Sequence, residues 1–176
     1  FAPSAAQNSR YIMYLANYPS QNSPTGFTDE PKYFTARVQP TPYDPDANVR
    51  QDAYLRALQA HCPSVELHYG HFLRHQIWAE NANPPPRKVS IWKNEEKGSD
   101  VNLALHVLND AWQNAYDCAV IVSNDSDLAE SLGMVKAQHR KVIGLITPGA
   151  PQRKTSWELR KHADFVKPIT PALVAE

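Results

Sequence analysis

The sequence predicts one α/β domain built on a mostly parallel central sheet. Strand-like and helix-like segments alternate from about Tyr33 onward, which is the pattern of parallel strands joined by helical crossovers. One segment, Cys118–Val122, is apolar throughout and rich in β-branched residues, as expected of a strand covered on both faces. A chain of 176 residues can bury a sizeable core within a single domain.

The predicted domain is preceded by a segment, residues 1–31, that is hard to interpret. It contains a strand-like run at 11–16 and then a stretch rich in Asn, Ser and Pro, which predicts a loop. The domain itself is expected to cover residues 32–176. Its first half is predicted to contain strands at 32–38, 65–72 and 88–93, a helix at 47–61, and irregular chain at 39–46 and 79–86. The strand at 88–93 alternates polar and apolar residues, which indicates one solvent-exposed face.

A second helix is predicted to begin at Gly98 and Ser99, with Ser99 as its N-cap. Its core-facing stripe is expected to comprise Val101, Ala104, Leu105, Leu108 and Trp112. The chain then alternates again, with the strand Cys118–Val122, a helix at 128–137, a strand at 141–146, a loop at 147–154, a short capped helix from Thr155 and a last strand at 164–166.

The bulk composition limits the classes of function. The formal net charge is zero, so any contact with nucleic acid must depend on local groups. The sequence contains neither an apolar run long enough to span a bilayer nor a signal-peptide pattern at its start. The two cysteines, Cys62 and Cys118, are expected to be free thiols in a reducing cytosol. These observations predict a cytoplasmic protein with no membrane partner.

The acidic residues Asp125 and Asp127 lie where the buried strand Cys118–Val122 gives way to a helix. In open α/β sheets, ligands bind beyond the carboxyl ends of the strands, and clustered carboxylates there attract Mg²⁺ or Mn²⁺. A third acid, Asp100, falls in the first turn of the preceding helix. The simpler alternative is that these acids only cap helices and complement the helix dipole.

Two stretches carry a resemblance to a known family. KGSDVNLALHVLNDA (97–111) and DCAVIVSNDSDLAESLGMVK (117–136) resemble the NYN domain family, the LabA-like branch of the PIN-like nucleases. The resemblance extends over roughly residues 32–168. It implies a three-layer PIN-like α/β domain whose acidic pocket binds Mg²⁺ or Mn²⁺ and cleaves RNA.

The family's motifs transfer to particular residues of this chain. Asp100 matches the acid of a Lys-Gly-x-Asp motif, and Asp125 and Asp127 match the acids of a Ser-x-Asp-x-Asp motif. The resemblance therefore implies that these three aspartates are the catalytic and metal-binding residues. Ser123 and Asn124 flank the acidic pair, where they are expected to hold a water molecule or a substrate phosphate.

The start of the chain departs from the family. The family opens with a strand ending in an Asp-Gly-x-Asn type motif, which supplies a further acid. The strand-like run at 11–16 leads instead into the neutral Asn17, and the first acid after it is Asp29. An acid from elsewhere, Asp29 or Asp164, can fill the gap only if the fold brings it to the site.

The main functional hypothesis is a metal-dependent ribonuclease that hydrolyses RNA phosphodiesters at the acidic edge of the sheet. Its alternative is a catalytically impaired domain that binds RNA or another protein, and a homodimer is left open. Among the adjacent basic pairs, Arg153-Lys154 is best placed to contact phosphate, because its loop follows a strand of the sheet. The other basic pairs are Arg87-Lys88, Arg140-Lys141 and Arg160-Lys161, and each pair by itself is most simply ordinary solvated surface. The four tryptophans are most simply core and rim residues; Trp92 or Tyr43 can stack a base, but nothing in the sequence selects them.

Overall fold

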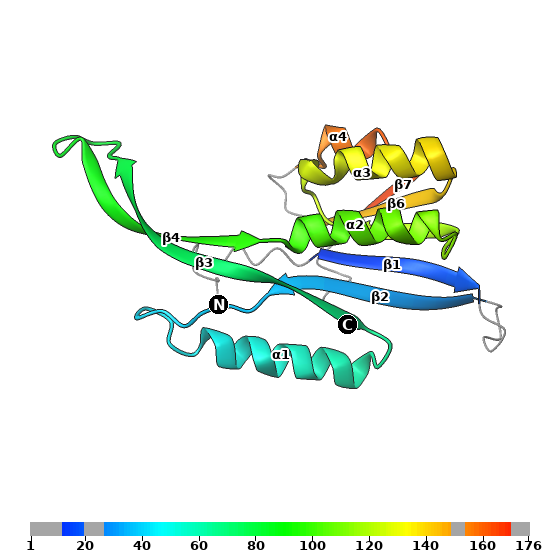
Figure 1. The fold of residues 1–176 in the computed structure, drawn as a ribbon, viewed down its shortest axis with the longest axis horizontal. Helices are drawn as coiled ribbons and strands as arrows, with labels where there is room; N and C mark the ends of the chain where they lie inside the picture. Colours follow the sequence, from blue (N-terminus) through cyan, green and yellow to red (C-terminus); the bar gives the residue numbers. More distant parts are fainter. Residues whose placement is uncertain (1–11, 20–26, 149–153, 170–176) are drawn as a thin grey trace.

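The computed structural model describes residues 12–19, 27–148 and 154–169. In this part of the chain seven strands form one sheet, and helices cover both of its faces (Figure 1). The strands are β1 (Ile12–Pro19), β2 (Phe27–Ala36), β3 (Glu66–Glu80), β4 (Lys88–Lys97), β5 (Cys118–Val122), β6 (Val142–Pro148) and β7 (Phe165–Ile169).

The helical elements form the outer two of three layers. They are α1 (Ala47–His61), α2 (Ser99–Trp112), the 3₁₀ turn η1 (Ser126–Leu128), α3 (Ala129–Met134), the π-helical turn η2 (Val135–His139) and α4 (Trp157–Arg160). Figure 1 shows α1 on one face of the sheet and α2, α3 and α4 on the other. None of these described helices is long and apolar enough to cross a membrane.

The sheet has the strand order β4-β3-β2-β1-β5-β6-β7 and is mixed. The pairs β2–β3, β5–β6 and β6–β7 are parallel, whereas β1 is antiparallel to both of its neighbours and β4 is antiparallel to β3. Because β1 is reversed between β2 and β5, the strands β2, β3, β5, β6 and β7 all run in the same direction. The prediction of a mostly parallel sheet is thus only partly confirmed. The predicted boundary between residues 31 and 32 falls inside β2, which begins at Phe27 within the predicted loop.

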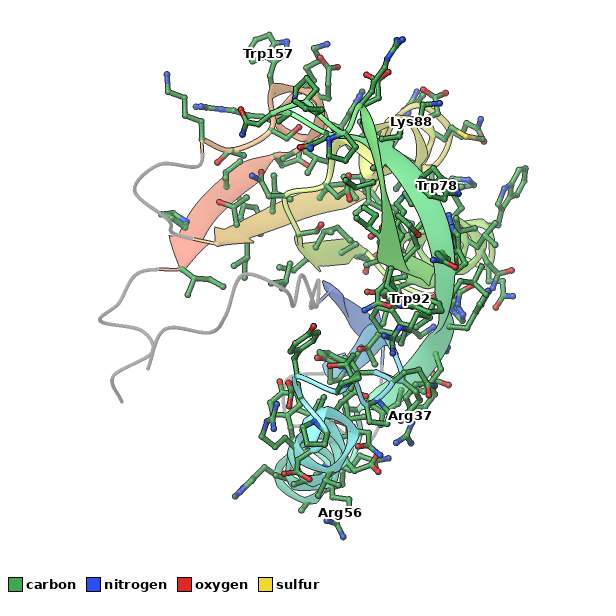
Figure 2. The ribbon with its side chains drawn as sticks, turned by 90° about the vertical axis from the view of Figure 1, so that its left-hand side faces the viewer. Arg37, Arg56, Trp78, Lys88, Trp92 and Trp157 are labelled. Atoms are coloured by element: carbon green, nitrogen blue, oxygen red, sulfur yellow. The ribbon has the colours of Figure 1, made fainter. Side chains whose placement is uncertain are left out.

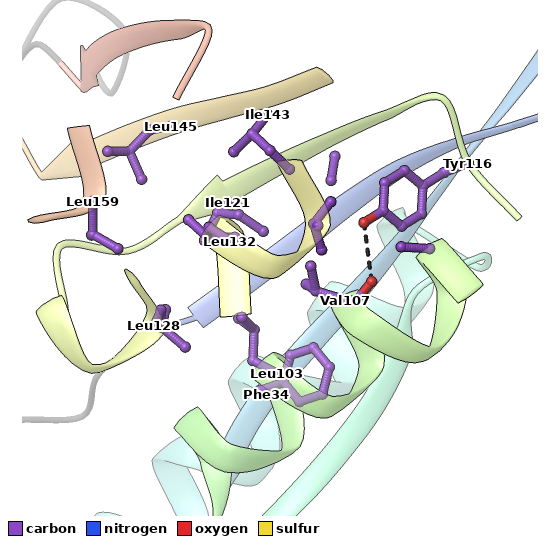
Figure 3. Packing of buried hydrophobic residues seen from close by; sticks show 13 residues of the cluster. Phe34, Leu103, Val107, Tyr116, Ile121, Leu128, Leu132, Ile143, Leu145 and Leu159 are labelled. Carbon is purple, nitrogen blue, oxygen red and sulfur yellow. Dashed lines mark hydrogen bonds between the residues drawn. The ribbon is translucent and has the colours of Figure 1, made fainter. Parts of the chain in front are cut away.

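The main core lies between the sheet and the α2–α3 layer (Figure 3). On β5 the side chains of Ala119 and Ile121 are fully buried in this core, and Tyr116 anchors the entry to the strand by donating a 3.0 Å hydrogen bond to the Val107 carbonyl oxygen. The other three side chains of β5 are only partly buried. The prediction that β5 is covered on both faces is therefore only partly confirmed. The described core on the opposite face of the sheet is built around Tyr33 of β2, Leu55 of α1 and Val65, which directly precedes β3.

The buried face of α2 differs from the predicted stripe. Val101, Leu105 and Trp112 are exposed, and Ala104 and Leu108 are partly buried at the margin of the core. The buried residues are Ser99, Leu103, Val107, Asp110 and Ala111. The prediction failed because this face includes two polar residues, so the more apolar stripe beside it had the stronger sequence signal. The N-cap is also corrected, since it is Gly98 at φ 96° and the Ser99 hydroxyl donates to the Glu96 carboxylate instead.

The strands β3 and β4 extend beyond the sheet as a two-stranded arm (Figure 1). β2 ends at Ala36, opposite Gly70, so the last part of β3, from His71 to Glu80, pairs only with β4. β3 is therefore much longer than the predicted strand at 65–72. Large apolar side chains are exposed on both faces of the arm, so the prediction of a single wet face for β4 is also wrong.

Candidate functional site

The acidic segment after β5 is a hydrogen-bonded turn. The buried Ser123 hydroxyl accepts a 3.1 Å hydrogen bond from the Asp125 amide, and Asp125 Oδ1 accepts one of 3.1 Å from the Asp127 amide. Asp125 is therefore the N-cap of η1, as the simpler alternative predicted. Its second oxygen, Oδ2, is buried, whereas the Asp127 residue is exposed.

Asn124 connects this turn to the chain that precedes α4. Its amide Nδ2 donates to the Lys154 carbonyl oxygen at 3.1 Å, and its Oδ1 accepts from the Ser156 amide at 2.7 Å. The structure therefore gives Asn124 a positioning contact, and the substrate contact expected of Ser123 and Asn124 remains a prediction. Lys154 is exposed beside this junction, and Arg153 lies outside the described residues.

Asp100 lies in the first turn of α2, at the same edge of the sheet. The start of α2 lies against Gly70, where an added Cβ would stand 2.3 Å from the Lys97 carbonyl oxygen and 3.0 Å from the Ser99 amide nitrogen. Gly70 is therefore required for this close approach. Gly70 pairs with Ala36, the last residue of β2, so the start of α2 lies at the carboxyl edge of the sheet. α2 also contacts η1, the turn that Asp125 caps. One oxygen of Asp100, Oδ1, is buried.

The two acidic segments thus meet at the carboxyl edge of the sheet. Among the side chains that the structure describes, no three carboxylate, imidazole or thiol groups form a cluster able to hold a metal ion. A metal site that uses Asp100, Asp125 and Asp127 together therefore remains a prediction.

The family's first acid has no counterpart here in Asn17 or Asp29. Because β1 is antiparallel to β5, Met13 pairs with Val122 at the acidic edge, whereas Asn17 pairs with Asp29 toward the opposite edge. Asn17 and Asp29 are thus excluded by the direction of β1.

Asp164 is also excluded, since it precedes β7 at the amino edge of the sheet. It accepts hydrogen bonds of 2.7 Å from Lys136 Nζ and from the Ile143 amide. The Lys136 hydrogen bond, followed by the backbone one, holds the pKa of the Asp164 carboxyl below its ordinary value. Asp164 therefore stabilises the fold far from the acidic turn.

Sequence reasoning missed a polar cluster beneath α2. The rings of His68 and His106 lie 4.1 Å apart, and the His68 ring stacks on Phe34 at 4.8 Å. Burial, then the neighbouring His68 and Lys32, lowers the pKa of His106. The i, i+4 spacing of His106 and Asp110 on α2 was the available sequence signal. His71 lies on the face of β3 opposite His68, because side chains alternate between the two faces along a strand.

Comparison with known proteins identifies the class of domain. The NYN domain family matches residues 49–170, and the chain belongs to this family. The matched region includes Asp100, Asp125 and Asp127 but begins after β1 and β2.

The chain also resembles a curated protein of Pseudomonas putida (strain DSM 28022 / S16), 6-hydroxy-3-succinoylpyridine 3-monooxygenase HspA. The two are 35% identical over 146 residues, which cover 77% of this chain and 45% of the relative. The chain thus spans less than half of that relative's length. A solved structure, a protein of unknown function (VPA0982) from Vibrio parahaemolyticus RIMD 2210633, aligns with a TM-score of 0.47 at 19% identity, covering 77% of this chain and 66% of that one.

Proposed function

We propose that this chain is a metal-dependent ribonuclease whose acidic edge hydrolyses RNA phosphodiesters. One observation carries the proposal. The two family motifs are separated in the sequence by α2 and β5, yet Asp100 lies in the first turn of α2, Asp125 caps η1, and α2 packs against η1. Carboxylates from separate segments at the carboxyl edge of a sheet suit the binding of a cation and a phosphate.

The donor groups fit a hard divalent cation. Asp100, Asp125 and Asp127 offer only carboxylate oxygens, and Mg²⁺ is usually held by one or two carboxylates together with water and substrate phosphate. A bound Mg²⁺ or Mn²⁺ would lower the pKa of a water molecule and neutralise charge on the phosphate. The protein's own contribution would be orientation, because the Ser123 and Asn124 hydrogen bonds fix the turn and the adjoining chain. Lys154, and Arg153 before it, would contact the RNA backbone.

The proposal implies a slow enzyme. β1 contains no acidic residue and runs opposite to β5, so this strand does not supply the family's further carboxylate. Each 1.4 kcal/mol lost in the transition state lowers the rate about tenfold. A site with one carboxylate fewer should also bind the cation more weakly. We therefore expect activity to be easier to detect when Mn²⁺ is in excess over the protein than when it is stoichiometric.

The test compares the parent chain with Asp125→Asn in the cleavage of labelled single-stranded RNA with and without Mn²⁺. Asparagine also caps helices, so this substitution removes the charge while the turn is kept. We expect metal-dependent cleavage by the parent and a loss of at least about tenfold in the variant. Equal rates would exclude catalysis at this turn and leave the RNA-binding or protein-interaction module as the alternative.

The monooxygenase relative favours a second candidate, an oxygen-dependent hydroxylation of a pyridine. Such a reaction inserts one oxygen atom of O₂ and reduces the other to water, so it needs a two-electron reductant. The candidate is tested by oxygen uptake with 6-hydroxy-3-succinoylpyridine and a reduced nicotinamide. Uptake that depends on the pyridine would support it, and its absence in an active ribonuclease preparation would remove it.

A further inference from the structure

The arm formed by β3 and β4 has two faces of different composition. Side chains alternate between the two faces along a strand, and paired residues share a face. The register of β3 and β4 therefore assigns each side chain of the arm to one of its two faces. One face, here called the tryptophan face, comprises Phe72, Arg74, Gln76, Trp78 and Glu80 of β3 with Lys88, Ser90, Trp92, Asn94 and Glu96 of β4. Two contacts confirm the assignment: the Arg74 guanidinium lies 4.9 Å from the Trp92 ring centre, and Gln76 Nε2 donates to Ser90 Oγ at 2.5 Å.

The two tryptophans are unusually exposed for residues of this size. Trp78 is 72% exposed and Trp92 is 62% exposed, and the register places them diagonally across the strand pair (Figure 2). Diagonal neighbours on one face stand about 7–8 Å apart, so the two rings can act together on one bound molecule. The opposite face carries the smaller apolar side chains Leu73 and Ile91.

The charges of the two faces are arranged differently. On the opposite face, Lys93 and Lys97 both pair with Glu95. On the tryptophan face, neither Arg74 nor Lys88 takes part in an ion pair within the described residues. The acids of this face have other contacts, since Glu80 lies 3.9 Å from Arg87 and Glu96 accepts from Ser99. Two cations therefore stand beside two exposed aromatic rings.

The tryptophan face is continuous with the side of the sheet that carries Asp100. Even-numbered residues of β3 face α2, because His68 contacts His106 and Gly70 lies against the backbone of Ser99. The same parity continues to Arg74 and Trp78 in the arm. From Trp92 to the end of β4 the distance is roughly 17 Å at about 3.4 Å per residue, and Asp100 follows three residues later.

We propose that the tryptophan face binds single-stranded RNA and leads it to the acidic edge. Bases would stack on Trp78 and Trp92, and Arg74 and Lys88 would contact the phosphates. Stacking on aromatic rings beside basic side chains is how proteins bind single strands without sequence preference. The choice of RNA rests on the proposed function, since the acidic edge on the same side is proposed to hydrolyse RNA.

The test measures binding of a labelled twelve-nucleotide single-stranded RNA by fluorescence anisotropy in EDTA, so that hydrolysis does not contribute. Trp92→Ala is expected to raise Kd by about fivefold to a hundredfold, in line with the stacking contribution of one base. Trp92→Phe should retain most of the affinity. Arg74→Ala should weaken binding and reduce the slope of log K against log salt by about one. The matched control is Trp112→Ala, because Trp112 is 69% exposed but lies at the far end of α2.

Three outcomes would overturn this inference. The first is an unchanged Kd in Trp92→Ala and in the Trp78→Ala/Trp92→Ala double variant. The second is an equal loss of affinity in Trp112→Ala, and the third is a loss of circular dichroism signal or melting temperature that accounts for the weaker binding. If light scattering shows that the double variant dissociates a dimer without changing RNA affinity, the face binds a second protein chain and the inference fails. If the chain binds RNA through the arm but cleaves none, the inference is supported and the ribonuclease proposal is refuted. Asp125→Asn should lower the cleavage rate and leave the Kd for RNA unchanged.

Discussion

The ammonium group of Lys32 on β2 lies 2.6 Å from the Asp110 carboxylate on α2, with side chains only 11% and 7% exposed. This ion pair joins residues 78 positions apart and ties α2 to the sheet. Removing one partner of a buried pair leaves the other charge without compensation.

Asp110→Ala is expected to lower the free energy of unfolding by about 3–5 kcal/mol, measured by urea denaturation. The matched control is Asp117→Ala, because Asp117 lies 3.5 Å from Lys141 with its own side chain 69% exposed. That pair should contribute less than about 1 kcal/mol. A double variant Lys32→Met/Asp110→Leu should recover most of the loss, and similar costs for the two single alanine variants would contradict the prediction.

The metal prediction can be tested without any assay of catalysis. Mn²⁺ in excess is expected to raise the melting temperature, since a ligand at 100 times its Kd stabilises the native state by about 2.7 kcal/mol. Asp100→Asn should abolish this shift. Asp117→Asn is the control, because Asp117 precedes β5 at the other end of the strand from Asp125. A shift that persists in Asp100→Asn would place the metal elsewhere.

Asn124→Ala should release the chain that precedes α4. The variant loses two hydrogen bonds to the backbone of Lys154 and Ser156, and its stability should fall by about 1–3 kcal/mol. The sharper readout is trypsin cleavage after Lys154, followed by mass spectrometry, which should become faster than in the parent. Asn109→Ala, on the exposed surface of α2, should leave this cleavage unchanged; if it does not, the effect is not local.

The His106 environment predicts how stability depends on pH. The pKa of His106 is lowered from 6.5 by burial, then by His68 and Lys32, and the carboxylates of Asp110 and Glu66 oppose the shift. Between the lowered folded pKa and 6.5 the unfolded chain binds more protons, so the contribution of His106 makes stability fall as pH drops below 6.5.

The measurement is the urea midpoint at pH 7.5, 6.5 and 5.5. His106→Gln should flatten the dependence over this range, and the exposed His75→Gln should not. Carboxyl groups with a lowered pKa change stability only at more acidic pH than this range. For example, the hydrogen bonds from Lys93 and Lys97 lower the pKa of Glu95 to about 2. An unchanged slope in His106→Gln would assign the dependence to other groups.

Much of the local structure could be predicted from the sequence. The helix at Ala47–His61 and the strand at Cys118–Val122 have the predicted bounds, because each is a continuous run of suitable residues bordered by residues that end it. The acidic motifs were recognisable for the same reason, since their spacing is short and local. Family membership followed from them and is confirmed by the match to residues 49–170.

The tertiary structure decided what depends on distant partners. A strand has the same period of two in either direction, so the reversal of β1 was not visible in its sequence, yet it removes Asn17 and Asp29 from the acidic edge. On the buried face of α2 the charge of Asp110 is compensated by Lys32, a partner on β2 that the sequence of the helix does not reveal. The arm arises because β3 continues past the end of β2. Local runs and motifs were thus determined by the sequence alone, whereas strand direction, helix orientation and the exposed tryptophan face required contacts between residues far apart in the chain.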